Sequence, residues 1–186
     1  KIRHDALYKR FVCFHKLKND ALTIPALNAV LEDKGSPYTE RARLTLAQLY
    51  QQKNQHRQAC ELYVALTDSK NKEVKTDAIL QAALLSQKLG DKKATKVWFT
   101  KSMSDPGSRE WHGQSQVALM NLHYQDKEWQ SVIDVFKKGD FKLDQKTALQ
   151  RLIMTAKSHE ALGNTKEASR FEVEISKLSP KTMTGY

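Results

Sequence analysis

Apolar residues recur with a helical period along most of the chain, and polar residues fill the positions between them. Apolar positions three and four residues apart place one hydrophobic stripe on one face of an α-helix. The pattern predicts helices over residues 40–52, 76–89, 110–125 and 145–162, each followed by a second helix. With a further hairpin over 1–38, we expect ten helices in five antiparallel pairs.

The second helix of each expected pair carries a repeated motif, a small residue followed by a larger apolar or aromatic one a turn later. Two helices approach within about 8–10 Å only where one offers a small side chain, and the larger residue then fills the space toward the next pair. The small residues are separated by 33, 35, 38 and 36 positions. The pairs are Ala26 with Val30, Ala59 with Tyr63, Ala94 with Trp98, Val132 with Phe136, and Ala168 with Phe171.

Helix-breaking residues fall between the expected helices. Gly90 and Gly163 lie where a helix end favours a positive φ, and Asp144 is a good N-cap for the last pair. Ser36-Pro37 reads as an N-cap with proline at the first helical position. Pro25 fits the first turn of its helix.

A repeat of helix pairs, none of which can bury its own apolar face, favours an all-α solenoid in which successive hairpins stack side by side. We expect an N-terminal hairpin over 1–38, repeats over 39–180, and a tail or linker over 181–186. The chain begins with Lys1, so we also expect a processed protein or a piece of a longer one.

The motifs resemble the tetratricopeptide repeat family, whose first helix carries leucine, a small residue and tyrosine and whose second carries alanine and an aromatic residue. One repeat matches well, and Gly163, Ala168 and Pro180 match the end of the last. The resemblance implies a right-handed superhelical solenoid of about five antiparallel helix pairs, with divergent repeats and first helices that line a concave groove. The well-matched repeat carries Leu46, Ala47, Tyr50, Ala59 and Tyr63.

That geometry selects a set of groove positions, which we expect to bind a protein or peptide partner. They are Leu44, Gln48 and Gln51, then Leu80, Leu84 and Gln87, then Val117, Asn121 and Tyr124, followed by Ile153, Lys157 and Glu160. The first nine are apolar, aromatic or amide residues, suited to an extended peptide. The basic clamp with which related proteins hold a chaperone C-terminus is missing, because its positions are occupied by Leu44, Gln48, Leu80 and Leu84.

The net charge of +10 raises the possibility of a nucleic-acid partner. The basic residues are spread nearly evenly and no run of five like charges occurs. A solvated lysine-rich surface explains this better than a phosphate-binding track. Spacings of 33 to 38 residues also argue against one-base-per-repeat RNA reading. We therefore expect a protein partner rather than nucleic acid. No stretch is apolar enough to span a membrane.

No catalytic or metal-binding constellation is apparent, so we expect no enzyme activity, no cofactor and no metal. The six histidines form no zinc-protease motif, and glycine-rich phosphate loops are missing. Cys13 and His15 lie two apart, which points them away from each other on a helix. Cys13 and Cys60 read as buried thiols that pack as small hydrophobes, and a disulfide between them stays open.

The leading hypothesis is a protein–protein interaction scaffold that belongs to a larger protein or assembly. Two alternatives remain, an RNA-binding helical-repeat protein and a structural spacer between domains. The sequence leaves open the oligomeric state and the compartment; a bacterial cell envelope and a cytoplasm both fit.

Overall fold

The computed structural model describes residues 2–139 and 141–178, and this part of the chain contains ten α-helices, one 3₁₀-helix and no strand. The predicted helix count and all-α class are therefore confirmed. The expected tail over 181–186 and Pro180 lie outside the described residues. The helices are α1 (Ile2–Lys16), α2 (Asp20–Glu32), α3 (Thr39–Gln52), α4 (His56–Val64), α5 (Lys72–Lys88), α6 (Lys92–Ser104), η1 (Pro106–Trp111), α7 (His112–Gln125), α8 (Trp129–Phe136), α9 (Gln145–Ala161) and α10 (Thr165–Leu178).

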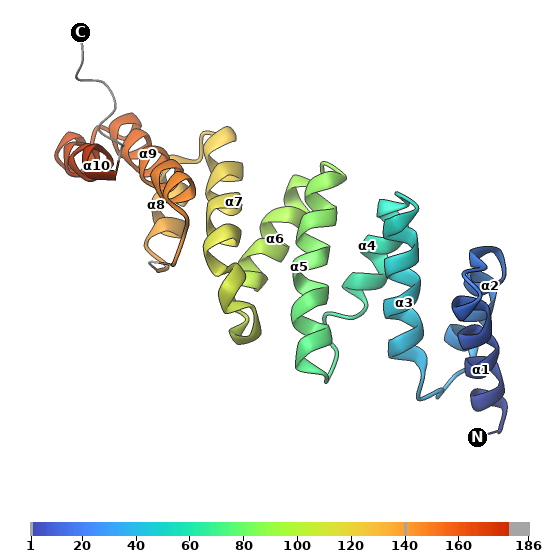
Figure 1. Ribbon diagram of the computed structural model, residues 1–186. Helices are drawn as coiled ribbons and strands as arrows, with labels where there is room; N and C mark the ends of the chain where they lie inside the picture. The colour runs from blue at the N-terminus through green and yellow to red at the C-terminus, as the bar shows by residue number, and fades with distance from the viewer. Residues whose placement is uncertain (1, 140, 179–186) are drawn as a thin grey trace, which may run out of the picture. The chain divides into compact units, whose positions relative to one another are not determined.

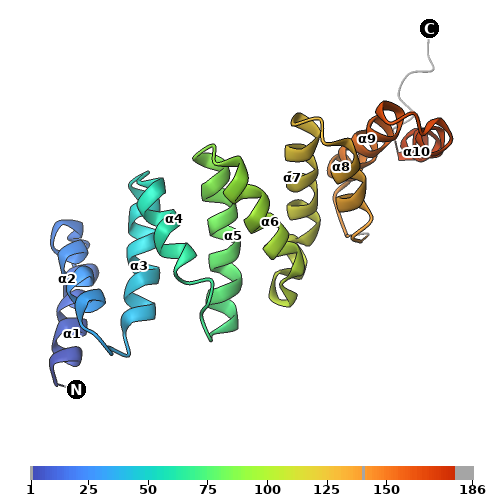
Figure 2. The same cartoon turned by 180° about the vertical axis from the view of Figure 1, so that it is seen from behind.

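Contacts divide the chain into two compact units, one up to Ala94 and one from Thr95 onward. In the first unit, α1 pairs with α2 and α3 with α4, while α2 packs on α3 and α4 on α5. The helix α3 lies in front of α4 in Figure 1 and behind it in Figure 2, which is the view from the opposite side. In the second unit, α7 pairs with α8 and α9 with α10, and α8 packs on α9.

The same turn ends the first helix of all five hairpins. A residue with φ between 53° and 76° recurs at separations of 36, 36, 37 and 36 residues. The N–H of the next residue donates to the carbonyl five residues earlier, at 2.8–3.1 Å, which is a Schellman-type helix end. The turns therefore supply a structural register for the repeat. The residues with positive φ are Lys18, Asn54, Gly90, Lys127 and Gly163.

This register corrects two of the predicted small residues. The position five residues after each turn residue is buried in every hairpin, with 6% exposure at most. The first and third copies are threonines, so the predictions of Ala26 and Ala94 as anchors were wrong. A threonine fits this dry position because its hydroxyl can donate to the carbonyl a turn earlier, as Thr23 does to Asn19 at 2.7 Å. The five anchors are Thr23, Ala59, Thr95, Val132 and Ala168.

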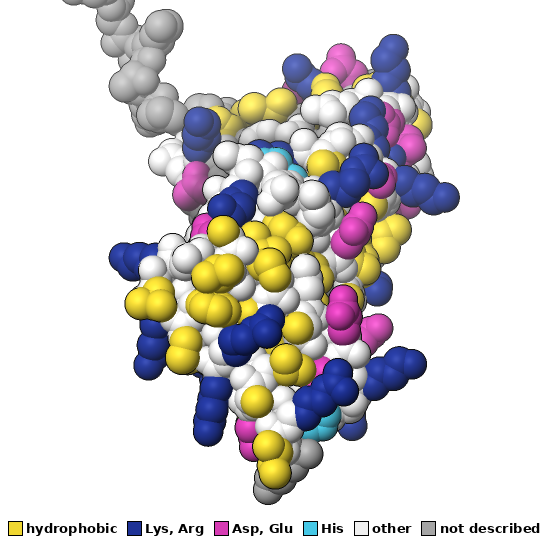
Figure 3. All heavy atoms as spheres, turned by 90° about the vertical axis from the view of Figure 1, so that its right-hand side faces the viewer, with side chains coloured by type: hydrophobic (Ala, Val, Ile, Leu, Met, Phe, Trp, Pro, Cys, Tyr) yellow, Lys and Arg dark blue, Asp and Glu magenta, His cyan; other side chains and the backbone are white. Residues whose placement is uncertain are grey.

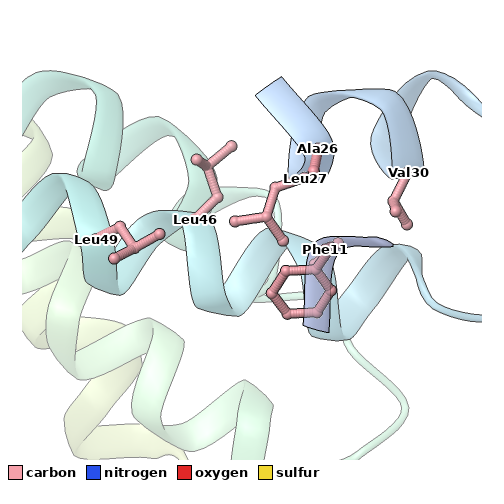
Figure 4. Close-up of a cluster of buried hydrophobic side chains, with 7 residues drawn as sticks. Phe11, Ala26, Leu27, Val30, Leu46 and Leu49 are labelled. Carbon is pink, nitrogen blue, oxygen red and sulfur yellow. The ribbon is translucent and has the colours of Figure 1, made fainter. Parts of the chain in front are cut away.

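A continuous apolar core joins the first hairpins. Leu27 of α2 is fully buried and points toward Phe11 of α1 and Leu46 of α3 (Figure 4). Ala42 of α3 is also fully buried in this cluster. The next cluster surrounds Ala59 and so carries the packing from α3 and α4 to α5. The second helix of one hairpin thus buries the first helix of the next.

Two predicted helix starts differ from the structure. The helix α3 begins at Thr39, so Ser36 is not its N-cap; the Ser36 hydroxyl instead accepts from the Tyr38 N–H at 3.3 Å, in the preceding turn. Pro25 lies inside α2 rather than in its first turn, because Asn19 caps that helix earlier. Pro25 is on the exposed side of α2, where water can satisfy the carbonyl that a proline leaves without a donor.

The cysteines differ from the expected buried pair. Cys13 is exposed and Cys60 is half-buried, and both are free thiols. The Cys60 sulfur lies 3.7 Å from the Ser86 hydroxyl, a polar neighbour that the apolar surroundings in the sequence did not indicate.

Candidate functional site

The turn register places the predicted binding residues at equivalent points of successive first helices. They lie ten, six and three residues before the turn residue in α3, α5 and α7. We call these the binding positions, after the partner contact that the sequence predicts for them. None of the nine carries a charge in these three helices: Leu44, Gln48 and Gln51; Leu80, Leu84 and Gln87; Val117, Asn121 and Tyr124.

In the first unit, the binding positions range from buried to open. Among them, Leu84 of α5 is the most exposed apolar side chain, at 44%, whereas Leu80 one turn earlier is only 9% exposed. Gln48 and Gln87 are exposed, and Leu44 is half-buried. The exposed part of these positions on α3 and α5 therefore consists mainly of Leu84, Gln48 and Gln87.

Gln51 is used inside the unit. Its amide oxygen accepts from the Tyr63 hydroxyl at 3.1 Å, and its amide nitrogen donates to Gln81 of α5 at 3.1 Å. Burial first, and then the nearby Asp77 carboxylate, raise the pKa of Tyr63 to about 12, so the phenol stays protonated and remains a donor. Gln51 of α3 therefore links Tyr63 of α4 to Gln81 of α5.

In the second unit, the three predicted residues of α7 are mostly covered. Val117 is 7% exposed, and Asn121 and Tyr124 are half-buried. The Tyr124 ring packs edge-on against Trp129 of α8, with ring centroids 5.2 Å apart. The side chains at these positions of α7 are therefore less exposed to solvent than Leu84 and Gln87 of α5.

In α1 the same offsets from the turn residue fall at Tyr8, Val12 and His15, which the sequence analysis did not name. Tyr8 is half-buried and stacks on Tyr38, with ring centroids 4.1 Å apart. His15 is exposed. A 36-residue offset from Leu44, Gln48 and Gln51 would have found all three, but the first hairpin has no glycine at its turn to reveal that offset.

The described residues contain no group of three histidine, cysteine, aspartate or glutamate side chains able to hold a metal ion. Cys13 and His15 are both exposed on α1. None of the helices within 2–139 and 141–178 combines the length and the apolar character needed to cross a bilayer.

The fold is shared by solved structures of repeat proteins. The chain matches the crystal structure of MamA with a TM-score of 0.56 and 13% identity, over 98% of this chain and 97% of MamA. It matches a tetratricopeptide repeat protein from Parabacteroides merdae with a TM-score of 0.56 and 13% identity, over 98% and 69% of the two chains. The chain has the tetratricopeptide repeat fold. PilF of Pseudomonas aeruginosa is also similar, with a TM-score of 0.51, 15% identity, and coverage of 97% and 78%.

No protein-family model matches the chain, and no curated protein matches its sequence. Three of the five tetratricopeptide-like turns carry lysine or asparagine where positive φ favours glycine, and two of the five buried anchors are threonines. The hairpins of this chain therefore form without a glycine at every turn or an alanine at every anchor.

Proposed function

We propose that the chain is a protein–protein interaction scaffold that binds an extended polypeptide along its first helices. Leu84 is the observation that carries the proposal: it is a leucine 44% exposed at a binding position, with exposed Gln48 and Gln87 at other binding positions of α3 and α5. A leucine supplies apolar contact area, and the amides can pair with a peptide backbone. The tetratricopeptide-like fold supports such a role, because repeat proteins present extended binding surfaces.

The uncharged binding positions define the class of partner. An acidic tail or a terminal carboxylate requires lysine or arginine for tight recognition, and none of the nine residues supplies one. The partner segment is therefore apolar and amide-rich, and its backbone rather than its charge is recognised.

Affinity capture with matched variants tests the proposal. We expect Leu84→Arg and Gln48→Arg to deplete at least one captured protein by about tenfold or more, equivalent to about 1.4 kcal/mol. Val97→Arg and Gln58→Arg are the controls, because they place the same new charge on exposed positions of the second helices α6 and α4. The depleted protein is then purified and its affinity for the four variants measured by titration calorimetry. Equal capture by all four variants would contradict the proposal.

A further inference from the structure

The side-chain hydrogen bonds of Gln51 continue past the nine binding positions to an exposed carboxylate on α5. Gln81 accepts from Gln51, and its own amide nitrogen donates to Asp77 at 3.4 Å. The Tyr63 hydroxyl donates to Gln51 at the buried end of the chain. Because a carboxylate only accepts hydrogen bonds, Asp77 sets the direction in which both amides are turned. Asp77 is therefore connected to the binding position Gln51 through one continuous network.

Asp77 also lies on the same exposed ridge of α5 as Leu84. The two residues are seven positions apart, which is two turns of a helix, and both are exposed. The separation corresponds to about 10 Å along the helix axis, which an extended peptide covers in about three residues. A peptide segment that contacts Leu84 therefore reaches Asp77 as well.

The Asp77 charge acts on the side of α5 that faces the preceding hairpin. After burial, the Asp77 carboxylate is the second cause that raises the pKa of Tyr63 to about 12. Tyr63 is a buried residue of α4 and the hydrogen-bond donor to Gln51 of α3. The carboxylate thus belongs to the same side of the first unit as the binding positions.

The equivalent charged residues of the first unit have side-chain partners. Asp5 in α1, Arg41 in α3 and Asp77 in α5 each lie thirteen residues before the turn residue. Asp5 accepts from the Tyr38 hydroxyl at 2.7 Å, and the Arg41 guanidinium lies 5.8 Å from the centroid of the Tyr8 ring. Asp77, by contrast, forms no ion pair with any residue of 2–139 or 141–178, and its hydrogen bond comes from a neutral amide.

Helix capping does not account for Asp77. Acidic residues stabilise a helix within its first turn, and α5 begins at Lys72. The N-cap of this helix is Asn71, whose side chain accepts from the N–H groups of Glu73 and Val74. Asp77 comes after the first turn, so its charge is available to a partner.

We propose that Asp77 determines specificity by pairing with a lysine or arginine of the bound segment, about three residues from the aliphatic side chain that contacts Leu84. This inference rests on the proposed function and adds one charged contact outside the nine uncharged binding positions. The rest of the segment stays apolar and amide-rich.

The overall charge of the chain would produce the opposite preference. The net charge is +10, and lysine and arginine side chains project from many points of the face seen in Figure 3. Such a surface attracts acidic peptides and repels basic ones. A preference for lysine or arginine at one position of a peptide therefore requires a local carboxylate.

Selection from a phage-displayed library of random peptides of about 12 residues, at 150 mM NaCl, tests the proposal. We expect the peptides selected by the wild type to share an aliphatic residue and, about three positions from it, a lysine or arginine. Asp77→Lys should keep the aliphatic residue and replace the basic one by aspartate or glutamate. Glu61→Lys, the same charge change on the exposed surface of α4, should select the wild-type pattern.

Fluorescence anisotropy with one selected peptide measures the size of the effect. We expect the wild type to bind the lysine-containing peptide about tenfold more tightly than a version with glutamate in its place. An exposed ion pair contributes up to about fivefold, and the like-charge pair opposes binding. Asp77→Asn keeps an oxygen that accepts from Gln81 but loses the charge, so it should reduce the ratio to about twofold or less. Glu61→Gln should leave the ratio unchanged.

Leu84→Arg separates this inference from the proposed function. If Leu84→Arg loses the selected peptides but these show no basic position, the role of Asp77 is overturned and the scaffold function stands. The same conclusion follows if Asp77→Lys still selects a basic residue there. If no selected peptide depends on Leu84, both proposals are overturned.

Discussion

At the scale of single residues, Gln116 holds the second unit together through its amide. It is fully buried. Its nitrogen donates to the carbonyls of Val135, Phe136 and Gly139 at 2.9–3.1 Å, and its oxygen accepts from Arg151 at 3.2 Å. One side chain of α7 thus satisfies carbonyls at the end of α8 and binds a residue of α9.

We expect Gln116→Leu to lower the free energy of unfolding by about 2–4 kcal/mol, because it removes the donor and acceptor from several buried polar groups at once. Urea denaturation followed by circular dichroism measures this. Gln114→Leu is the control: Gln114 is exposed on the same helix, and its substitution should change stability by less than about 0.5 kcal/mol. Similar losses for the two variants would contradict the structural role of the Gln116 amide.

His159 is a second buried polar residue, 8% exposed and stacked on Phe171 with ring centroids 5.6 Å apart. Its Nδ1 has no hydrogen-bond partner among the described residues. Burial lowers the pKa of the imidazole below 6.5; Lys137 adds to this effect and Glu167 opposes it. The folded protein therefore resists protonation at this site more than the unfolded chain does.

As pH falls, the unfolded chain takes up a proton at His159 before the folded protein does. The contribution of neutral His159 to the free energy of unfolding is therefore fully present above about pH 6.5, and it is lost as pH drops through that value toward the folded-state pKa. We expect the urea midpoint of the wild type to decrease between pH 7.5 and 5.5, and His159→Phe to show a smaller decrease. Parallel pH profiles for the two proteins would show that His159 does not contribute to acid sensitivity.

At the scale of elements, the turn between the two helices of a hairpin has the same backbone conformation in all five described hairpins, although its residue types vary. Gly90 and Gly163 adopt the left-handed region without a Cβ, whereas Lys18, Asn54 and Lys127 adopt it with a side chain. A Cβ built at Gly90 meets nothing within 4 Å, so a substitution there tests the backbone conformation without a steric clash.

We expect Gly90→Ala to lower the free energy of unfolding by about 1 kcal/mol, and Lys127→Gly to raise it by about 0.5 kcal/mol. The reason is that a residue with a Cβ adopts the left-handed backbone conformation at a higher free energy than glycine does. Thermal and urea unfolding measure both. The opposite signs make each variant the control for the other. A loss of stability in both would mean that the Lys127 side chain contributes more than the strain it causes.

At the scale of the whole molecule, the turn spacing removes one argument against RNA binding. The sequence motifs suggested separations of 33 to 38, which would not suit one base per repeat, but the turns recur every 36 or 37 residues. The net charge of +10 remains, and it produces salt-sensitive attraction to any polyanion.

We therefore expect labelled oligo(U) and oligo(A) to bind weakly and equally at 50 mM NaCl, and the affinity to fall by about 100-fold or more at 300 mM, as counterion release requires. Filter binding or anisotropy measures this. A strong preference for one sequence that persists at 300 mM NaCl would favour the RNA-binding alternative over the scaffold.

The amino-acid pattern was enough to predict ten helices in five pairs, because helical periodicity and helix-end glycines are local signals. The tetratricopeptide-like class came from the resemblance of the repeated motifs to that family. It located the anchors at Ala59, Val132 and Ala168 but missed Thr23 and Thr95. A buried threonine depends on a hydrogen bond to its own helix, and residue type does not reveal that bond.

Only the tertiary structure decided which predicted positions meet solvent. Leu80 and Leu84 look alike in the sequence, yet one is 9% and the other 44% exposed. Gln51 and Gln48 are both amides, but Gln51 is held by Tyr63 and Gln81. Burial and hydrogen-bond pairing depend on neighbouring helices distant in sequence, whereas helix formation depends on residues within a few turns.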